Sequence, residues 1–95
     1  MSPEEFKSYV LWWAKKMGVS DKVKSIHIRP MKRKIASCSS KGRLTFDPSV
    51  LRETEEKRDH IIVHELLHLT HRNHGKLFKC LLKAYISFKD RKLSE

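Results

Sequence analysis

The feature that most restricts the fold of this chain is the pentapeptide His-Glu-Leu-Leu-His, which runs from His64 to His68 inside an apolar stretch. In an α-helix, side chains four positions apart lie on one face, so this spacing predicts a helix that holds the two imidazoles side by side. The same spacing directs Glu65 toward the open side of any metal ion that both imidazoles bind. The fold must therefore bury the apolar side of this helix behind the histidines.

The residue types in the pentapeptide indicate metal-dependent hydrolysis. Neutral imidazole is a good ligand for Zn²⁺, and a catalytic zinc site uses three protein ligands and one water, whose pKa falls to about 7. Glu65 would act as a general base that takes a proton from this water and passes it to a leaving amine. The alternative is that His64 and His68 are two surface histidines with no shared ligand.

A zinc site of this kind needs a third ligand, and two downstream histidines compete for that role. If the helix continued, His71 would share the histidine face, but its Cα would lie about 10 Å along the axis from that of His64. Asn73 and Gly75 tolerate the left-handed conformation that ends helices, so the chain could turn after Arg72 and return His74 to the metal. We favour His74 over His71.

Length and composition describe the setting of this motif. A chain of 95 residues forms a single domain with a modest core. No apolar run approaches the ~20 residues of a membrane span, and the acidic start differs from a secretory signal, so we expect a cytoplasmic protein and no membrane partner. Cys38 and Cys80 are expected to be free thiols rather than metal ligands.

The net charge of +10 raises the question of a nucleic-acid partner. Basic residues cluster between Arg29 and Lys34 and again from Lys83 to Lys92, and such clusters attract phosphate groups or acidic peptides. No aromatic-basic motif or zinc-finger spacing accompanies them. Solvated charge is therefore the favoured interpretation, and nucleic-acid binding is the less favoured one.

The N-terminal segment carries the signals of an amphipathic helix. Ser2 and Glu5 have the spacing of a capping box, Pro3 suits the first helical position, and Gly18 suits the end. Apolar residues follow at helical spacing between these limits, and both Trp12 and Trp13 are expected to pack in the core.

Three extended stretches and two more helices follow. Strands are predicted over 23–29, 34–38 and 43–47, and the last two form a hairpin because Gly42 lies at the turn between them. A helix from about Glu55 carries the histidine motif, and an apolar pattern after Gly75 predicts a closing helix. The predicted fold class is α+β, a small domain with an N-terminal helix, a three-stranded sheet, an active-site helix and a C-terminal helix.

Three ordered motifs now give the chain a recognisable pattern. The runs Ser37–Leu44, Ile62–Leu69 and His71–Phe78 resemble the YgjP-like zinc metallopeptidase family, including its minimal members called minigluzincins. The resemblance covers roughly residues 24–88. Two differences from the usual family pattern, Ile35-Ala36 and Lys79, bear on the shape of the pocket.

The resemblance implies a small zincin-like fold and a role for each motif residue. One Zn²⁺ per chain would be held by His64, His68 and His74, with Glu65 as general base. The strand that contains Ala36, Ser37 and Cys38 would line the cleft and hold a peptide or protein substrate as an added strand. The implied activity is zinc-dependent hydrolysis of peptide bonds.

Three further expectations accompany this one. The polar tail, residues 89–95, either frays or folds across the cleft, where a carboxylate from Asp90, Glu95 or the terminus would block the zinc and make the full-length chain latent. A basic zinc protein that docks on DNA, as SprT-like proteases do, is one alternative function. A structural zinc-binding domain is the other, and it would need a fourth protein ligand.

Overall fold

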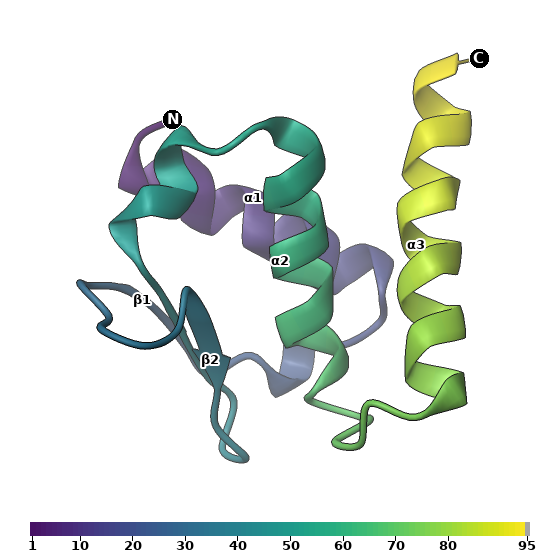
Figure 1. Ribbon diagram of the computed structural model, residues 1–95, viewed down its shortest axis with the longest axis horizontal. Helices are drawn as coiled ribbons and strands as arrows, with labels where there is room; N and C mark the ends of the chain where they lie inside the picture. Colours follow the sequence, from purple (N-terminus) through teal and green to yellow (C-terminus); the bar gives the residue numbers. More distant parts are fainter. Residues whose placement is uncertain (95) are drawn as a thin grey trace.

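The structure is a computed structural model that describes residues 1–94, with side chains for residues 1–89. The predicted α+β class is confirmed, because the domain combines three α-helices with a small three-stranded sheet (Figure 1). The elements are, in order, α1 (Pro3–Lys16), η1 (Ser20–Lys22), β1 (Ser25–Ile28), β2 (Ala36–Cys38), β3 (Arg43–Phe46), η2 (Pro48–Arg52), α2 (Glu55–Leu67) and α3 (Lys76–Ser94).

Helix α1 begins and ends where its sequence signals predict. The Ser2 and Glu5 side chains exchange the two hydrogen bonds of a capping box, and Gly18 takes a positive φ of 72° just beyond the helix. Trp13 is fully buried, but the expectation for Trp12 was wrong, since 40% of its surface is exposed. Adjacent helical positions point about 100° apart, so only one of the two indoles can face the core.

The sheet places β3 in the centre, with β1 parallel to it on one side and β2 antiparallel on the other. The predicted hairpin between β2 and β3 is present. Gly42 adopts a φ of 87° at its turn, and a Cβ there would lie 2.1 Å from the Lys22 carbonyl oxygen, so glycine is required. Strand β2 is an edge of the sheet, and its outer side is free of other strands.

Helix α2 lies between the sheet and α3 in Figure 1 and carries the histidine motif. Thr54 caps its start by accepting a hydrogen bond from the Lys57 amide. Its inner face is apolar and contributes Ile62, Val63 and Leu66 to the core, all fully buried. The histidines are thus attached to the best-packed helix of the domain.

The predicted end of this helix was wrong. Helix α2 ends at Leu67 rather than Arg72, because the amides of Leu69 and Thr70 bond to carbonyl groups three positions back and tighten the last turn. Neither Asn73 nor Gly75 has a positive φ, so the expected left-handed residues do not produce the turn. The chain instead leaves the helix through a tight turn over residues 68–70.

Helix α3 runs beside α2 in the opposite direction, from the loop near the histidines to the far end of the molecule (Figure 1). Phe78 is buried at its start, whereas Leu77, also expected in the apolar face, is 60% exposed. The backbone of residues 89–94 continues this helix. At 1.5 Å per residue, α3 carries Ser94 about 27 Å from Lys76. The Asp90 side chain and Glu95 lie outside the described part of the chain.

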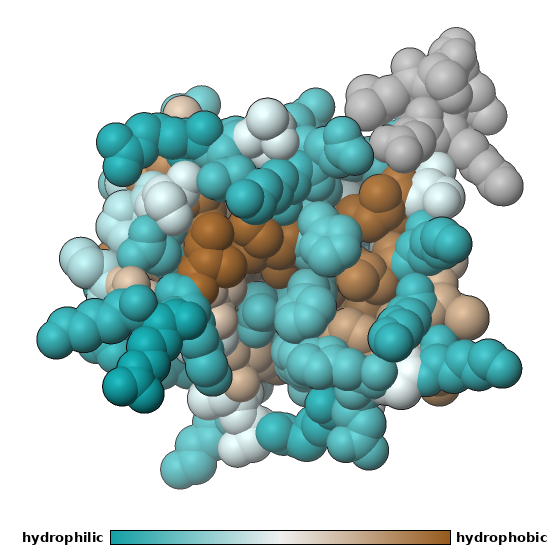
Figure 2. All heavy atoms as spheres, viewed as in Figure 1, coloured by the Kyte–Doolittle hydropathy of each residue, from teal (hydrophilic) through white to brown (hydrophobic). Residues whose placement is uncertain are grey.

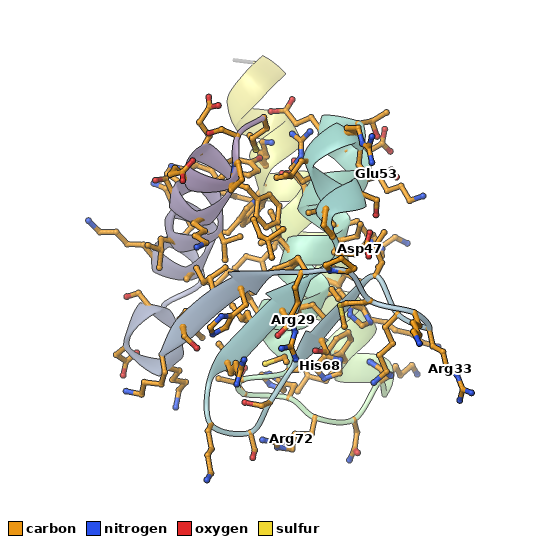
Figure 3. The ribbon with its side chains drawn as sticks, turned by 90° about the vertical axis from the view of Figure 1, so that its left-hand side faces the viewer. Arg29, Arg33, Asp47, Glu53, His68 and Arg72 are labelled. Atoms are coloured by element: carbon orange, nitrogen blue, oxygen red, sulfur yellow. The ribbon has the colours of Figure 1, made fainter. Side chains whose placement is uncertain are left out.

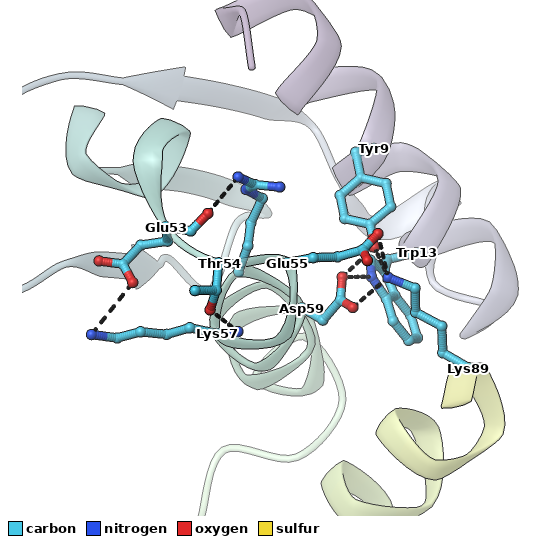
Figure 4. A network of polar contacts seen from close by, with 9 residues as sticks. Tyr9, Trp13, Glu53, Thr54, Glu55, Lys57, Asp59 and Lys89 are labelled. Carbon is cyan, nitrogen blue, oxygen red and sulfur yellow. Dashed lines mark hydrogen bonds and ion pairs between the residues drawn. The ribbon is translucent and has the colours of Figure 1, made fainter. Parts of the chain in front are cut away.

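A buried polar network joins the three helices (Figure 4). The Asp59 carboxylate on α2 accepts hydrogen bonds from the Tyr9 hydroxyl, from the Trp13 indole at 3.1 Å, and from the Lys89 ammonium. Lys89 also contacts Glu55 at 3.2 Å and is only 8% exposed, so its assignment to a polar tail was wrong. Its aliphatic stem and charge belong to the helix interface.

Among the described residues, no helix has the length and apolar character needed to cross a bilayer.

Candidate metal centre

Three histidines converge at the end of α2. One ligand atom from each of His64, His68 and His74 lies within 4.8 Å of the others, and the Nε2 atoms of His68 and His74 are 2.9 Å apart. His64 and His68 come from the same helical face, while His74 comes from the loop between α2 and α3. The early end of α2 makes this possible, because the chain has six residues in which to reverse.

The geometry and chemistry of this cluster fit a zinc ion. Ligand atoms bound at about 2.0–2.1 Å to one tetrahedral zinc lie roughly 3.3 Å apart, a spacing that small side-chain rotations reach from the observed one. Burial lowers the pKa of His68, and the neighbouring His64, His74 and Arg72 act in the same direction, while Glu65 opposes them. His68 therefore presents a neutral ring nitrogen, the form that binds metals.

Glu65 lies beside the three imidazoles. Its Oε2 is 3.0 Å from Nδ1 of His64, which fixes the orientation of that ring and leaves Nε2 for another partner. The residue is 8% exposed, yet its carboxylate lines the cleft. A carboxylate in this position can accept a proton from a molecule held at the histidines.

The ring of Phe78 supports the cluster from α3. Its centroid is 4.8–5.2 Å from the ring centroids of all three histidines, and its side chain is 2% exposed. Such contacts restrict the rotamers of the imidazoles without competing for their nitrogen atoms. Phe78 is therefore a positioning residue for the centre.

A cavity of about 400 Å³ opens over the histidines. Strand β2 forms one wall with Ala36, Ser37 and Cys38, the three residues expected there, and Lys34 and Arg72 complete the polar lining. Figure 3 shows Arg33 and Arg72 extending outward from different sides of the region that contains His68. The cleft thus combines a strand edge, the histidine cluster and basic groups.

Cys38 is an unsuitable metal ligand despite its place in the wall. Both cysteines are free, as expected. Burial raises the pKa of the Cys38 thiol to about 11, and the nearby Glu65 charge adds to the effect. Cys38 is also not among the residues whose ligand atoms converge, which are the three histidines.

The other candidates are placed elsewhere. His71 Nδ1 pairs with the Thr70 hydroxyl at 2.8 Å, and His71 is not part of the histidine cluster. Tyr9, Tyr85 and Arg43, each able in principle to stabilise an oxyanion, do not line this cavity. The sequence interpretation missed Lys34 and Arg72 as cleft residues, although the run of basic residues before β2 was a usable signal for the first.

Comparisons with known proteins bear on the family of this chain. The family described as YgjP-like, metallopeptidase domain, matches residues 2–92. The crystal structure of the metallopeptidase zymogen of Pyrococcus abyssi abylysin is similar to this chain, with 30% identity and a TM-score of 0.72 over 94% of this chain and 92% of that one. No curated protein matches. The chain belongs to the YgjP-like metallopeptidase family.

Proposed function

We propose that this protein is a zinc-dependent peptidase in which His64, His68 and His74 hold one Zn²⁺ per chain. The observation that carries the proposal is the convergence of three imidazole nitrogens, within 4.8 Å of one another, on an open cavity. Among the residues with described side chains, no fourth donor joins this group, and an open coordination position is typical of catalytic rather than structural zinc.

Glu65 is the general base in this proposal. When bound, zinc supplies Lewis acidity, which makes water nucleophilic near neutral pH and polarises a carbonyl group. Glu65 accepts the proton that the attacking water loses and returns it to the amine that leaves when the peptide bond breaks. His64, which Glu65 contacts at 3.0 Å, keeps this carboxylate beside the reacting groups.

The substrate is a peptide held in extended form along β2. In an antiparallel pair, backbone groups face the partner strand at every second residue. Ile35 and Ser39 bond to the β3 side of the sheet, at Asp47 and Arg43, so the N–H and C=O groups of Ala36 and Cys38 face the free edge. These groups can pair with an added strand next to the histidines.

Metal content and peptide cleavage test the proposal together. Wild type should hold one zinc per chain and digest casein in a chelator-sensitive manner, His74→Ala should lose both properties, and His71→Ala should keep both. Glu65→Gln should keep zinc and lose roughly 10²–10⁴-fold in turnover, the usual contribution of a general base.

Two results would contradict the proposal. Wild type without zinc would remove the metal site, and full activity in Glu65→Gln would remove the assigned base. Zinc bound without any cleavage would favour a structural role for the metal. The zymogen state belongs to abylysin, and direct assay of this chain shows whether latency applies here.

A further inference from the structure

The surface on both sides of the histidine cluster is strongly basic. A second cavity, of about 340 Å³, shares Lys34 and Ser37 with the cavity over the histidines. Figure 2 shows hydrophilic side chains over the loop between β1 and β2, which borders this second cavity. The cations that line the two cavities are Arg29, Lys32, Arg33, Lys34 and Arg72.

These cations have no acidic partners among the side chains that the structure describes. Among residues 1–89, whose side chains are described, none of the five forms an ion pair, and Glu65 is the one carboxylate that lines either cavity. Several acidic groups elsewhere are engaged in caps and ion pairs, such as Glu5 with Ser2 and Asp59 with Lys89. The cleft therefore attracts negative charge from outside the molecule.

The basic loop is held in a defined position beside β2. The Asp47 carboxylate accepts a hydrogen bond from the Met31 amide at 2.9 Å, and the Asp47 amide donates to the Ile35 carbonyl at 2.8 Å. The Arg29 amide bonds to the Phe46 carbonyl at 3.0 Å. Both ends of the loop are thus tied to β3, so Lys34 stays at the start of the strand edge.

Positive charge lies at each end of β2. Lys34 precedes Ala36 by two residues, and Arg72 lies close enough to Cys38 to influence its thiol electrostatically. At about 3.3 Å per residue, the distance along the strand from Lys34 to Cys38 is roughly 13 Å, or four residues of an extended peptide. A peptide on this edge would meet cations before and after the histidine cluster.

We infer that the cleft selects acidic peptides, with aspartate or glutamate residues about three to five positions apart on opposite sides of the scissile bond. This inference rests on the proposed function and assigns its substrate class. Peptide is favoured over nucleic acid because the strand edge offers backbone groups for an extended chain, and because no Phe, Tyr or Trp side chain lines either cavity to stack on bases.

Binding to the zinc-loaded Glu65→Gln protein tests the inference without turnover. The probes are three fluorescent eleven-residue peptides that differ only at two positions four apart, which are glutamate, glutamine or lysine. Two or three exposed ion pairs should make the glutamate peptide bind roughly tenfold more tightly than the glutamine peptide, with the lysine peptide weakest. This preference should shrink at 0.5 M salt, since salt screens exposed charges.

Charge reversal locates the effect. The variant K34E/R72E, made in the Glu65→Gln protein, should reverse the order of the three peptides, and K34Q/R72Q should abolish it. The matched control is K7E/K83E, which changes the net charge equally at exposed positions on α1 and α3 and should keep the preference. Circular dichroism checks that each variant is folded.

The outcomes separate this inference from the proposed function. A preference for the glutamate peptide that depends on Lys34 and Arg72 supports the inference. It does so even if wild type cleaves no peptide, because absence of cleavage contradicts the proposed function alone. Equal binding of the three peptides would overturn the inference, as would equal losses in K34E/R72E and K7E/K83E. Tighter binding of duplex DNA than of the glutamate peptide, lost in K34E/R72E, would also overturn it and assign the surface to nucleic acid.

Discussion

Helix α2 carries two polar clusters that differ in how their hydrogen-bonding groups are satisfied. Near its start, Asp59 receives donors from two other helices, and the charges of Asp59 and Lys89 compensate each other. Near its end, the ring nitrogens of His64, His68 and His74 face one another at an open cavity. The first cluster is complete within the protein, whereas the second becomes complete only with a ligand.

This difference separates structural from functional polar groups. A buried charge with a full set of partners fixes the packing of helices but has no remaining capacity for chemistry. The three imidazoles can still bind a ligand, because not every ring nitrogen has a carboxylate or carbonyl partner. Phe78 and the helix itself maintain their alignment. Four measurements test this distinction, beginning with the one expected to show the greatest change.

The largest expected effect is the loss of stability in Asp59→Ala. Removing the carboxylate leaves the buried Lys89 ammonium with the exposed Glu55 as its one remaining acidic partner among the described side chains, and it removes the acceptor for Tyr9 and Trp13. The free energy of unfolding should therefore fall by about 3–5 kcal/mol. Urea unfolding measures this. The control Asp21→Ala, at an exposed position in η1, should stay within about 0.5 kcal/mol. A loss below about 1 kcal/mol in Asp59→Ala would contradict the structural assignment.

Added zinc should bind the histidine cluster and stabilise the folded state. At a free zinc concentration 100 times its Kd, binding to the folded state adds about 2.7 kcal/mol, so the Tm of metal-free wild type should rise on zinc addition. His74→Ala should show no such rise. His60→Ala, which removes an exposed histidine from the same helix, serves as the matched control and should respond like wild type. A similar rise in both variants would show that zinc binds elsewhere.

High pH should weaken the first cluster. Hydrogen bonds and ion pairs with Asp59, Tyr9 and Glu55 outweigh burial and raise the pKa of Lys89 above its ordinary value of 10.5. Above pH 10.5 the unfolded chain loses this proton while the folded one keeps it, so stability should fall by about 1.4 kcal/mol per pH unit until the folded pKa is reached. Burial and the Asp59 hydrogen bond raise the pKa of Tyr9, which acts in the same direction.

Urea unfolding between pH 9 and 11.5 checks this slope. Asp59→Asn keeps the shape of the side chain but removes its charge, so its stability should depend less steeply on pH than that of wild type. Equal slopes in the two proteins would show that Lys89 and Tyr9 do not depend on Asp59.

The smallest expected effect concerns the helix that both clusters share. Thr54→Ala removes the cap of α2 and should cost about 1 kcal/mol of stability, while zinc affinity stays unchanged because the cluster lies at the opposite end. Thr70→Ala, at an exposed hydroxyl beyond α2, should cost less in the same unfolding assay. A loss of zinc affinity in Thr54→Ala would show that the two ends of α2 are coupled.

Local chemistry explains which features were predictable from sequence. The capping box of Ser2 and Glu5, the positive φ of Gly42 and the one-sided spacing of His64 and His68 each depend on neighbours within a few positions. The pairing of β2 with β3 followed from their short connection. Each of these features can therefore be recognised from a short stretch of sequence.

Features that depend on distant contacts were missed. Lys89 bonds to Asp59, which is 30 positions away in the sequence, and to Tyr9, which is 80 positions away. The polar residues around Lys89 give no sign that its side chain is buried. Trp12 and Trp13 are residues of the same type, and only packing against the other elements determines which of them is buried. The early end of α2 was also missed, because its last turn tightens before Asn73 and Gly75, the positions that the sequence indicated.

That early end also determines the order in which the site can assemble. The α2 pair, His64 and His68, is already aligned by the helix, so a metal ion can bind there first. Capturing His74 then closes a ring of only seven residues, 68 to 74, and the chain entropy lost on closing a loop grows with its length. We therefore expect rapid two-point capture followed by loop closure, with release of the metal governed by how often the loop containing His74 opens.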